Sequence, residues 1–454
     1  MPKLSRYNHL QPWTDGYHIA YNAGSGAVAL MTDENVAVYN SLADKLRPGQ
    51  QPSLTDQEQE LLKQLQYGRF VVEDSLDERE AFRFRHNMDR FDQTVLGLVL
   101  APTMACNMAC QYCYEANKQG RMSPQAVESL VTFVENRAPY LRALNTTWYG
   151  GEPLLAMDII EDLSTTFMDM AEEHKFAYAS SMISNGYLLT PKTVDRLAAL
   201  KVASVQLTID GPARIHNVKR PMKNGRPSFD TILNNIAYAV DKMTVNIRVN
   251  IDKAFTTDMI IEMLQELKAA GLQEKVGLYY GLIEPSTQAC ANISESCYET
   301  ADFSQVEIEY NRLLLEHGFR IDKLPAPMSA FCMAQIISSF LIDPEGRMFR
   351  CFNHVGDEKQ AIGTIREAID YQHPNFTRLF RADPFNEPLC YDCGLLPVCM
   401  GGCPSRRADR GMSGDQMCES WKHNLRPMLE IIARSRQQQL QRQQQAAAAA
   451  GTKE

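Results

Sequence analysis

The sequence predicts an α/β protein: a partial (β/α)6 TIM-like barrel between a small N-terminal α+β domain and a cysteine-rich C-terminal domain. Between residues 95 and 283, six short β-rich runs alternate with amphipathic stretches, which is typical of parallel strands joined by crossover helices. Residues 1–92 lack this alternation, and seven of the twelve cysteines lie between residues 332 and 418. The chain therefore divides into an N-terminal domain, a barrel, a cysteine-rich domain and a low-complexity tail. The expected bounds are 1–92, 93–320, 321–435 and 436–454.

The N-terminal domain is expected to begin with a β-hairpin, because Asn22-Ala-Gly-Ser-Gly26 has the composition of a turn between two β-rich runs. Two helices, a short strand and a charged helix are expected to follow, and the last of them leads into the barrel. These five elements cover residues 17–32, 34–45, 55–64, 68–72 and 76–89.

Six strands and five intervening helices are expected in the barrel. The strands cover residues 95–100, 146–149, 177–183, 203–209, 245–251 and 276–282. The helices cover residues 124–136, 159–173, 191–200, 229–242 and 257–270. Functional loops in such barrels lie at the carboxyl ends of the strands, so the residues that follow each strand are the first candidates for a site.

Composition limits the possible functions. A formal net charge of −9 argues against nucleic acid or an anionic membrane surface as the main partner. No stretch approaches the roughly 18 apolar residues of a spanning helix, and the first residues lack the apolar core of a signal peptide. We therefore expect a cytoplasmic protein. Thiols stay reduced in that compartment, so the twelve clustered cysteines indicate metal ligands rather than disulfides.

The strongest signal is the group Cys106, Cys110 and Cys113, which follows the first barrel strand. A 4Fe–4S cluster has four iron corners, and each usually takes one cysteine sulfur, so three thiolates leave one iron open. A structural zinc site is the alternative, but it needs a fourth Cys or His nearby, and none occurs in the next twenty residues.

This spacing, with the aromatic Tyr112 before the last cysteine, resembles that of the radical S-adenosylmethionine (radical SAM) enzymes. The resemblance implies that S-adenosylmethionine chelates the open iron. It further implies that one electron cleaves the cofactor to a 5′-deoxyadenosyl radical, which removes a hydrogen atom from the substrate. A ferredoxin or flavodoxin is the expected electron donor.

Two further segments resemble the family's cofactor contacts. Gly150-Gly151-Glu152 follows the second strand and is similar to the GGE motif, which contacts the methionine amino group. The glycines allow close backbone approach, and the carboxylate can accept bonds from an ammonium group. Ser184 and Asn185 follow the third strand, at the position that contacts the ribose in similar enzymes; the alternative is a plain turn.

The fourth and fifth strands supply the candidate substrate chamber. The segment that begins at Asp210 and contains His216 resembles the "LDGP…H…R" stretch of peptide and protein maturases, so both residues are expected to line the chamber or to brace its loop. Arg248 is expected to reach the SAM carboxylate, because a buried arginine needs an anionic partner. Tyr279 and Tyr280 either line the peptide path or pack in the core.

The C-terminal cysteines resemble the seven-cysteine SPASM extension, which carries two auxiliary 4Fe–4S clusters and so brings the expected total to three. By resemblance, four cysteines ligate the outer cluster and three the inner one. The outer set is Cys390, Cys393, Cys399 and Cys418; the inner set is Cys332, Cys351 and Cys403. A zinc ribbon is the alternative for Cys390 to Cys403, but it leaves the other three cysteines unexplained. The inner cluster has either an open iron or a fourth ligand borrowed from Cys290 or Cys297.

The strand and helix order of residues 1–92 resembles the small winged-helix-like domain with which many peptide-modifying radical SAM enzymes hold a leader peptide. Such domains add an extended peptide to a sheet edge. The alternative is an N-terminal cap without a ligand.

We therefore expect a maturase of a ribosomally made precursor peptide, and oxidative thioether or carbon–carbon crosslinking is the favoured reaction. Epimerisation would need a hydrogen donor such as Cys290 or Cys297. Sulfatase maturases, which form formylglycine, carry an acidic residue directly after the second SPASM cysteine, where this chain has Phe352. A small-molecule dehydrogenase or mutase and a non-catalytic iron–sulfur electron carrier are also compatible with parts of the sequence.

Overall fold

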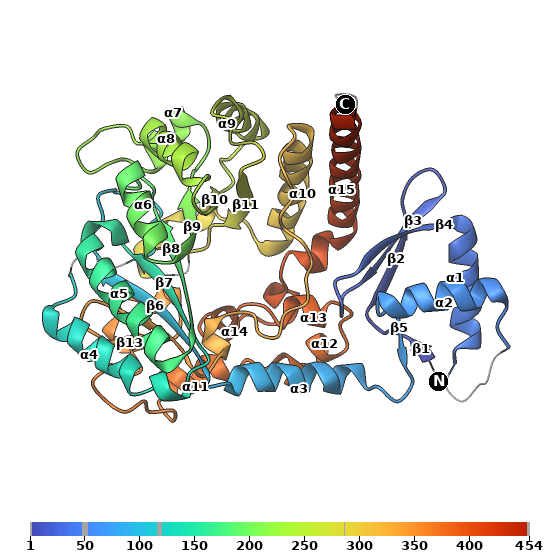
Figure 1. Cartoon of the computed structure of the whole chain (residues 1–454), viewed down its shortest axis with the longest axis horizontal. Coiled ribbons are helices and arrows are strands. Elements are labelled where there is room, and N and C mark those ends of the chain that lie inside the picture. The colour runs from blue at the N-terminus through green and yellow to red at the C-terminus, as the bar shows by residue number, and fades with distance from the viewer. Residues whose placement is uncertain (1, 48–52, 116–119, 286, 452–454) are drawn as a thin grey trace.

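The computed structural model describes residues 2–47, 53–115, 120–285 and 287–451. A barrel and the cysteine-rich region form one body, and a smaller N-terminal lobe lies beside it (Figure 1). The long helix α15 stands between them, and α3 runs along the bottom of the view from the lobe to the barrel. No helix among the described residues is long and apolar enough to cross a membrane.

The N-terminal lobe contains an antiparallel sheet in the order β2-β3-β4. Its strands are β2 (Asn8–Pro12), β3 (Tyr17–Asn22) and β4 (Val28–Thr32), and a separate pair joins β1 (Pro2–Leu4) to β5 (Val71–Glu73). Helices α1 (Asp33–Lys45) and α2 (Asp56–Tyr67) follow, with the side chains of Thr32 and Thr55 capping their N-termini. The predicted hairpin, helices and short strand are confirmed, whereas β1 and β2 were not predicted.

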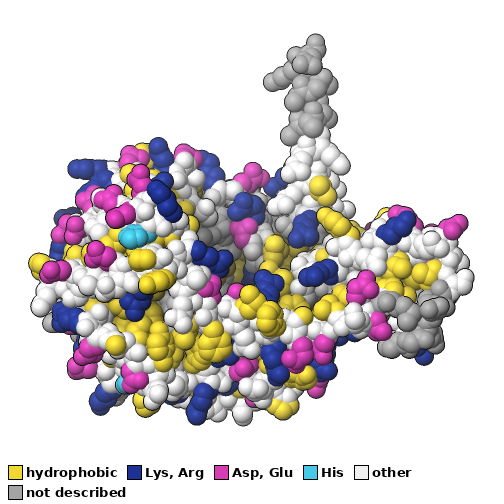
Figure 2. Space-filling view, turned by 60° about the horizontal axis from the view of Figure 1, so that its bottom comes forward, with side chains coloured by type: hydrophobic (Ala, Val, Ile, Leu, Met, Phe, Trp, Pro, Cys, Tyr) yellow, Lys and Arg dark blue, Asp and Glu magenta, His cyan; other side chains and the backbone are white. Residues whose placement is uncertain are grey.

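Helix α3 (Glu78–Phe91) fastens the lobe to the rest of the chain. Arg90 near its end donates to the carbonyl of Phe380 and forms an ion pair with Asp383, and Arg79 at its start stacks on the ring of Tyr391. Its outer face carries exposed Phe84, Met88 and Phe91. Figure 2, which turns this side toward the viewer, shows apolar side chains among basic and acidic ones across the front.

The six predicted barrel strands are all present and parallel, so the predicted α/β barrel is confirmed. They are β6 (Val95–Thr103), β7 (Ala143–Gly150), β8 (Ala177–Ser184), β9 (Val202–Thr208), β10 (Thr244–Ile251) and β11 (Val276–Leu282). Their helices are α4 (Pro124–Glu135), α5 (Met157–His174), α6 (Pro191–Ala199), α7 (Ala213–Lys219), α8 (Phe229–Ala239), α9 (Thr257–Ala269) and α10 (Thr300–Glu316). The apolar faces of these elements form the main core.

Two strands from the cysteine-rich region extend the barrel sheet. Strand β12 (Ser339–Ile342) pairs in parallel with β6, and β13 (Met348–Phe349) pairs antiparallel with β12. The fully buried Arg350 then holds this segment together, because its guanidinium donates to four main-chain carbonyls. Cys332 and Cys351 flank this pair of strands, so their loops are fixed to the edge of the barrel.

The rest of the cysteine-rich region consists of short helices and turns. The helices are α11 (Pro374–Phe380), α12 (Pro388–Tyr391), α13 (Leu396–Cys399) and α14 (Pro404–Ala408). The final helix α15 (Trp421–Gly451) packs against α10 and includes the Gln- and Ala-rich segment as far as Gly451.

Candidate functional site

The cysteine loop packs directly against the Gly-Gly turn. A Cβ atom on Gly150 would lie 2.2 Å from the carbonyl oxygen of Thr103, and one on Gly151 would lie 2.4 Å from that of Met104. The amide of Glu152 donates to the carbonyl of Ala105 at 2.9 Å. The two glycines therefore serve first to let the end of β7 approach the loop that follows β6.

Glu152 lies beneath this turn and has no exposed surface. Its carboxylate accepts bonds from Ser184 Oγ at 2.9 Å, from the amide of Asn185 at 2.8 Å and from the amide of Leu154 at 3.1 Å. Burial raises the pKa of Glu152 to about 6. Its carboxylate is thus engaged by the protein, and it positions Ser184 and Asn185 rather than facing a ligand.

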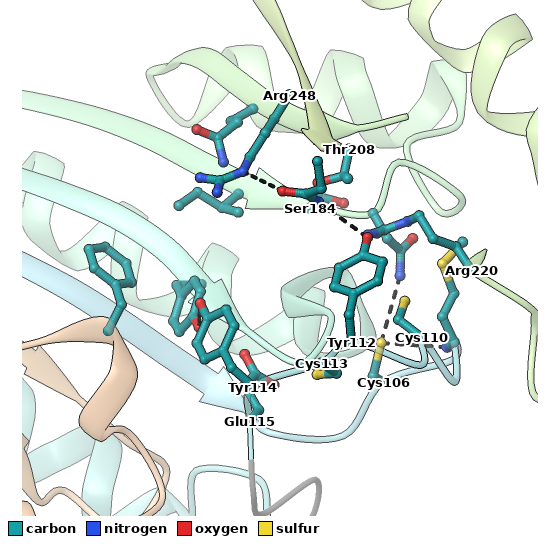
Figure 3. A pocket seen from close by; sticks show the side chains of 18 of the residues that line it. Cys106, Cys110, Tyr112, Cys113, Tyr114, Glu115, Ser184, Thr208, Arg220 and Arg248 are labelled. Atoms are coloured by element: carbon teal, nitrogen blue, oxygen red, sulfur yellow. Dashed lines mark hydrogen bonds between the residues drawn. The ribbon is translucent and has the colours of Figure 1, made fainter. Parts of the chain in front are cut away.

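The carboxyl ends of the barrel strands surround a cavity of about 550 Å³ (Figure 3). All three cysteines of the loop line it, together with Gly150, Gly151, Ser184, Asn185 and Arg248. The side chain of Asn185 reaches back to the loop and donates to Asn107 Oδ1 at 2.6 Å. The structure therefore brings the predicted residues of the cysteine loop and of the second, third and fifth strands into one cavity.

Arg248 presents a half-buried cation to this cavity. Its Nε donates to Asn250 Oδ1 at 2.8 Å, and its guanidinium carbon lies 6.0 Å from the centre of the Tyr279 ring. Gly281 on the neighbouring strand provides the space, since a Cβ there would lie 2.6 Å from Arg248 Nε. The carboxylates of Glu115 and Glu284 line the same cavity, and the guanidinium of Arg248 is suited to an anionic group of a ligand.

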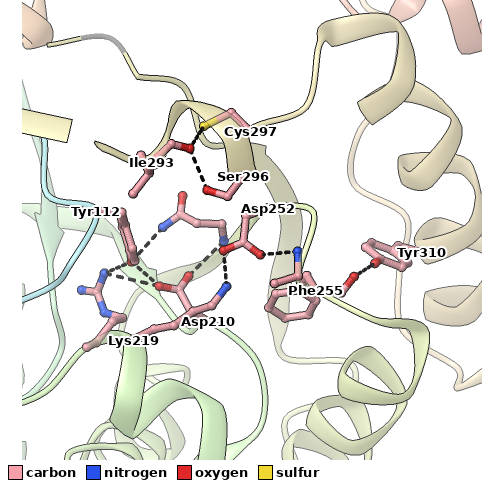
Figure 4. A network of polar contacts seen from close by, with 12 residues as sticks. Tyr112, Asp210, Lys219, Asp252, Phe255, Ile293, Ser296, Cys297 and Tyr310 are labelled. Carbon is pink, nitrogen blue, oxygen red and sulfur yellow. Dashed lines mark hydrogen bonds and ion pairs between the residues drawn. The ribbon is translucent and has the colours of Figure 1, made fainter. Parts of the chain in front are cut away.

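Asp210 and His216 do not line the cavity, contrary to the expectation that they face the substrate chamber; the structure supports the bracing alternative. Both are completely buried, and Asp210 lies beside Tyr112 (Figure 4). Tyr112 donates a hydrogen bond to Asp210 and accepts one from Arg220 Nη1 at 2.6 Å. The amide of Asn250 donates to the other carboxylate oxygen of Asp210 at 3.0 Å. Asp210 therefore fixes the aromatic ring of the cysteine loop.

His216 completes this support. Its Nδ1 accepts the amide of Asp210 at 3.3 Å, so Nε2 carries the proton, and Nε2 is buried without a partner among the described residues. Burial, aided by the charge of Arg220, lowers the pKa of His216 to about 3. The ring stays neutral at neutral pH, which is suited to a structural acceptor and not to a proton carrier.

Aromatic side chains form another wall of the cavity. Tyr114 and Tyr149 share a hydrogen bond of 2.5 Å between their hydroxyl groups, and the ring of Phe352 meets that of Tyr149 edge-on at 5.0 Å. The residue after Cys351 thus lines the cavity and carries no proton-accepting group, whereas the carboxylate of Glu115 lines the same cavity. Sequence reasoning missed Tyr114 and Tyr149, although both adjoin motifs that it singled out.

The tyrosines of the sixth strand lie elsewhere. Tyr279 donates to Gln206 Oε1 at 2.5 Å inside the barrel, and only Gln206 lines the cavity. Tyr280 is buried on the other face of the strand and donates to the carbonyl of Tyr310 at 3.1 Å. For Tyr280 the packing alternative holds.

The seven C-terminal cysteines fall into two neighbourhoods. Burial raises the pKa of Cys351 to about 12, and the charges of Cys403 and Cys332 add to the effect. Burial also raises the pKa of Cys399 to about 12, and the charges of Cys390 and Cys418 contribute. The charge of Cys393 in turn contributes to the raised pKa of Cys418. This grouping coincides with the predicted inner and outer sets, whose role as cluster ligands stays a prediction.

All twelve cysteines are free thiols in the structure. No three His, Cys, Asp or Glu side chains among the described residues lie close enough to hold a single metal ion. A four-iron cube takes one thiolate at each corner and so needs a wider arrangement than one ion. The four thiols of the outer set match the four corners of one such cube, and the choice between clusters and a zinc ribbon stays a prediction.

Cys290 and Cys297 are both buried. Cys290 Sγ lies 3.5 Å from Thr287 Oγ1, and Cys297 donates to the carbonyl of Ile293 at 3.2 Å. The hydrogen bonds given for the two thiols end on Glu284, Thr287 and Ile293. A fourth ligand borrowed from either of them stays a prediction.

Comparison with known proteins agrees with this geometry. Residues 100–267 match the model of the radical SAM superfamily. The chain carries a radical SAM domain, and it is an enzyme. The cysteine-type anaerobic sulfatase-maturating enzyme of Clostridium perfringens is 26% identical over an alignment of 364 residues that covers 72% of this chain and 94% of that protein. Mycofactocin maturase MftC of Mycolicibacterium smegmatis is 24% identical over an alignment of 346 residues that covers 70% of this chain and 81% of that protein.

Two solved structures share the fold. The structure described as native anSMEcpe with bound AdoMet and Kp18Cys peptide has a TM-score of 0.55 at 21% identity, covering 76% of this chain and 99% of that one. Streptococcus suis SuiB bound to precursor peptide SuiA has a TM-score of 0.51 at 16% identity, covering 89% and 95%. The matching domain implies S-adenosylmethionine and a 4Fe–4S cluster, and the three cysteines and the guanidinium of Arg248 in the cavity fit that pair.

Proposed function

We propose that this enzyme matures a ribosomally synthesised precursor peptide by radical SAM chemistry, with oxidative thioether or carbon–carbon crosslinking as the reaction. The observation that carries the proposal is the single cavity that contains Cys106, Cys110 and Cys113 and is closed on one side by Phe352 from the cysteine-rich region. When bound, the cluster and S-adenosylmethionine supply the radical that removes a hydrogen atom from the peptide.

The residues of the chain have separate tasks in this proposal. The three thiolates of the loop hold the SAM-binding cluster, and Arg248 binds the carboxylate of the cofactor. Gly150 and Gly151 offer main-chain groups to its methionine end, while Ser184 and Asn185, held by Glu152, reach its ribose. The aromatic wall excludes water and holds the peptide side chain. The inner and outer cysteine sets hold two auxiliary clusters, and a ferredoxin or flavodoxin supplies electrons.

The N-terminal lobe offers a specific edge for a leader segment. Two main-chain bonds, Asn22 N to Ala27 O and Asp33 N to Gly16 O, fix which residues of β4 pair with β3. Because antiparallel pairs alternate, Val28, Leu30 and Thr32 direct their main-chain groups to the free side of β4. Leu30 is also 49% exposed, so an extended peptide would find both hydrogen bonds and an apolar contact there.

The other outer strand is less accessible. In β2, the side chain of Gln11 donates to the carbonyl of Arg426 in α15, and His9 contacts the carbonyl of Gly394. These contacts place β2 against the cysteine-rich region, whereas β4 faces away from it. The leader therefore docks on β4 in our proposal.

The test uses the full-length, anaerobically reconstituted and reduced enzyme with S-adenosylmethionine and the short peptides encoded beside its gene. We expect 5′-deoxyadenosine and a peptide that has lost two hydrogen atoms for each new bond, detected by mass spectrometry. Cys113→Ala removes both products. If the wild-type enzyme forms deoxyadenosine but modifies none of these peptides, while a sugar or free amino acid is oxidised, the peptide assignment is wrong.

Leu30→Pro tests the docking edge. Proline at this position removes an outward N–H without removing a bond to β3, so the sheet survives while the added strand loses a hydrogen bond. We expect peptide affinity to fall about tenfold, because a lost hydrogen bond costs about 1 kcal/mol and the side-chain contact is lost as well. Leu30→Ala, which keeps the N–H, is the matched control and loses only the apolar contact.

A further inference from the structure

Two consecutive arginines of α14, Arg406 and Arg407, bind different partners. The helix begins directly after Cys403 of the inner set and lies before Cys418 of the outer set. Three residues in left-handed backbone conformations precede it: Met400 at φ 43°, Gly401 at 80° and Gly402 at 71°. This turn folds the chain back on itself, and a Cβ on Gly402 would lie 2.6 Å from the carbonyl of Met417.

Arg407 contacts the outer set directly. Its Nη2 lies 3.4 Å from Cys390 Sγ and 3.1 Å from the carbonyl of Gly401, and its Nη1 lies 3.5 Å from Glu387. The guanidinium is therefore held from two sides while it donates to a sulfur that the proposed outer cluster would use.

Arg406 is engaged differently. It is buried, and its Nε and Nη1 donate to Glu284 and Glu419 at 3.0 Å each. Glu284 lines the cavity and also accepts a bond from Arg410 at 3.0 Å. Arg406 thus links the cavity wall to the loop of Cys418, and two carboxylates offset its charge.

A hydrogen bond to a cluster sulfur stabilises the reduced, more negative state and so raises the reduction potential. We infer that Arg407 is a positioning residue that raises the reduction potential of the outer auxiliary cluster relative to the inner one. The charge of Arg406 is offset by Glu284 and Glu419, and its guanidinium donates to these carboxylates instead of to a cysteine sulfur. The inference rests on the auxiliary clusters of the proposed function, and it adds a specific cause for a difference between them.

The test measures the midpoint potentials of the auxiliary clusters by redox titration followed with electron paramagnetic resonance. The full-length reconstituted protein is measured intact and with Cys106, Cys110 and Cys113 changed to Ala, so that only auxiliary clusters contribute in the second case. We expect Arg407→Gln to move one auxiliary midpoint to a more negative potential and leave the other in place. Arg407→Lys, which can still donate one charged bond, shows a smaller shift in the same direction.

Arg378→Gln is the matched control. Arg378 pairs with Asp409 next to α14 and makes no bond to sulfur, so its loss leaves both midpoints unchanged. If Arg407→Gln keeps about twelve irons per chain and its midpoints are unchanged, the inference is wrong and the proposed function stands. The same holds if Arg407→Gln, Arg407→Lys and Arg378→Gln all shift the midpoints equally. About four irons in the wild-type protein would refute the auxiliary clusters themselves, and this inference with them. If Arg407→Gln loses iron, the inference is tested on Arg407→Lys alone: a negative shift of one auxiliary midpoint supports it, and unchanged midpoints overturn it.

Discussion

A substitution at Gly281 tests the role of Arg248 without changing the arginine itself. A Cβ at Gly281 would lie 2.6 Å from Arg248 Nε and 2.7 Å from its Cζ and Nη2, which is too close for any of them to stay. These atoms form the end of a flexible side chain, so in Gly281→Ala the guanidinium moves while strand β11 keeps its place. The substitution therefore displaces the proposed partner of the SAM carboxylate.

The magnitude follows from the bond that is lost. A hydrogen bond to a charged group contributes about 1.5–3 kcal/mol, and each 1.4 kcal/mol is a factor of ten in affinity. We expect S-adenosylmethionine to bind roughly ten- to a hundredfold more weakly to Gly281→Ala, measured by anaerobic equilibrium dialysis of the reconstituted protein. Arg248→Gln, which removes the charge, should lose at least as much.

Gly277→Ala is the control on the same strand and the same face. A Cβ there would lie 2.4 Å from Asn246 Oδ1, a comparable conflict with a flexible side chain away from the cavity. It should bind the cofactor with wild-type affinity. If Gly281→Ala also binds normally, with iron content and thermal stability unchanged, then Arg248 does not hold the carboxylate and the assignment is refuted.

Two predictions concern the support behind Tyr112. The pKa of His216 is lowered to about 3 in the folded state from an ordinary value of 6.5, so the unfolded chain binds the proton first and stability falls as the pH drops from 6.5 toward 3. Urea titrations should show about 1 kcal/mol less stability from this group at pH 5.5 than at 6.5, a loss absent in His216→Gln. Asp210→Asn should destabilise the protein by about 3–5 kcal/mol, because Arg220 loses its buried carboxylate; normal stability with abolished product formation would instead make Asp210 a catalytic residue.

The repeating parts of the fold could be predicted because they depend on local pattern. The barrel strands are continuous apolar runs separated by amphipathic helices, and the cysteine loop is a spacing that needs no tertiary information. Strand β12 could not be found in this way. It has four residues, and its partner β6 lies more than two hundred residues earlier in the chain, so only the tertiary fold selects the pairing.

The directions in which polar side chains point could not be predicted from the sequence either. Glu152, Asp210 and Ser184 are all polar and lie at or just after the carboxyl ends of barrel strands, so a pattern alone places each of them at the mouth of the barrel. The structure buries the two carboxylates and satisfies them with neighbouring donors, and only Ser184 lines the cavity. Burial of an acid requires several converging donors, which come from different strands and are not adjacent in sequence.

The β12–β6 pairing also explains how one cavity can serve both cofactor and substrate. The residues proposed to bind S-adenosylmethionine all belong to the barrel, whereas Phe352 comes from the cysteine-rich region and reaches the same cavity because β12 and β13 extend the barrel sheet. In the proposed function, a substitution at Phe352 changes the wall expected to face the substrate without touching the residues proposed to bind the cofactor. Arg350, two residues earlier, is buried and bonded to four carbonyls, which fixes the position of that wall. We therefore expect substitutions at Phe352 to change substrate choice and to leave radical generation intact.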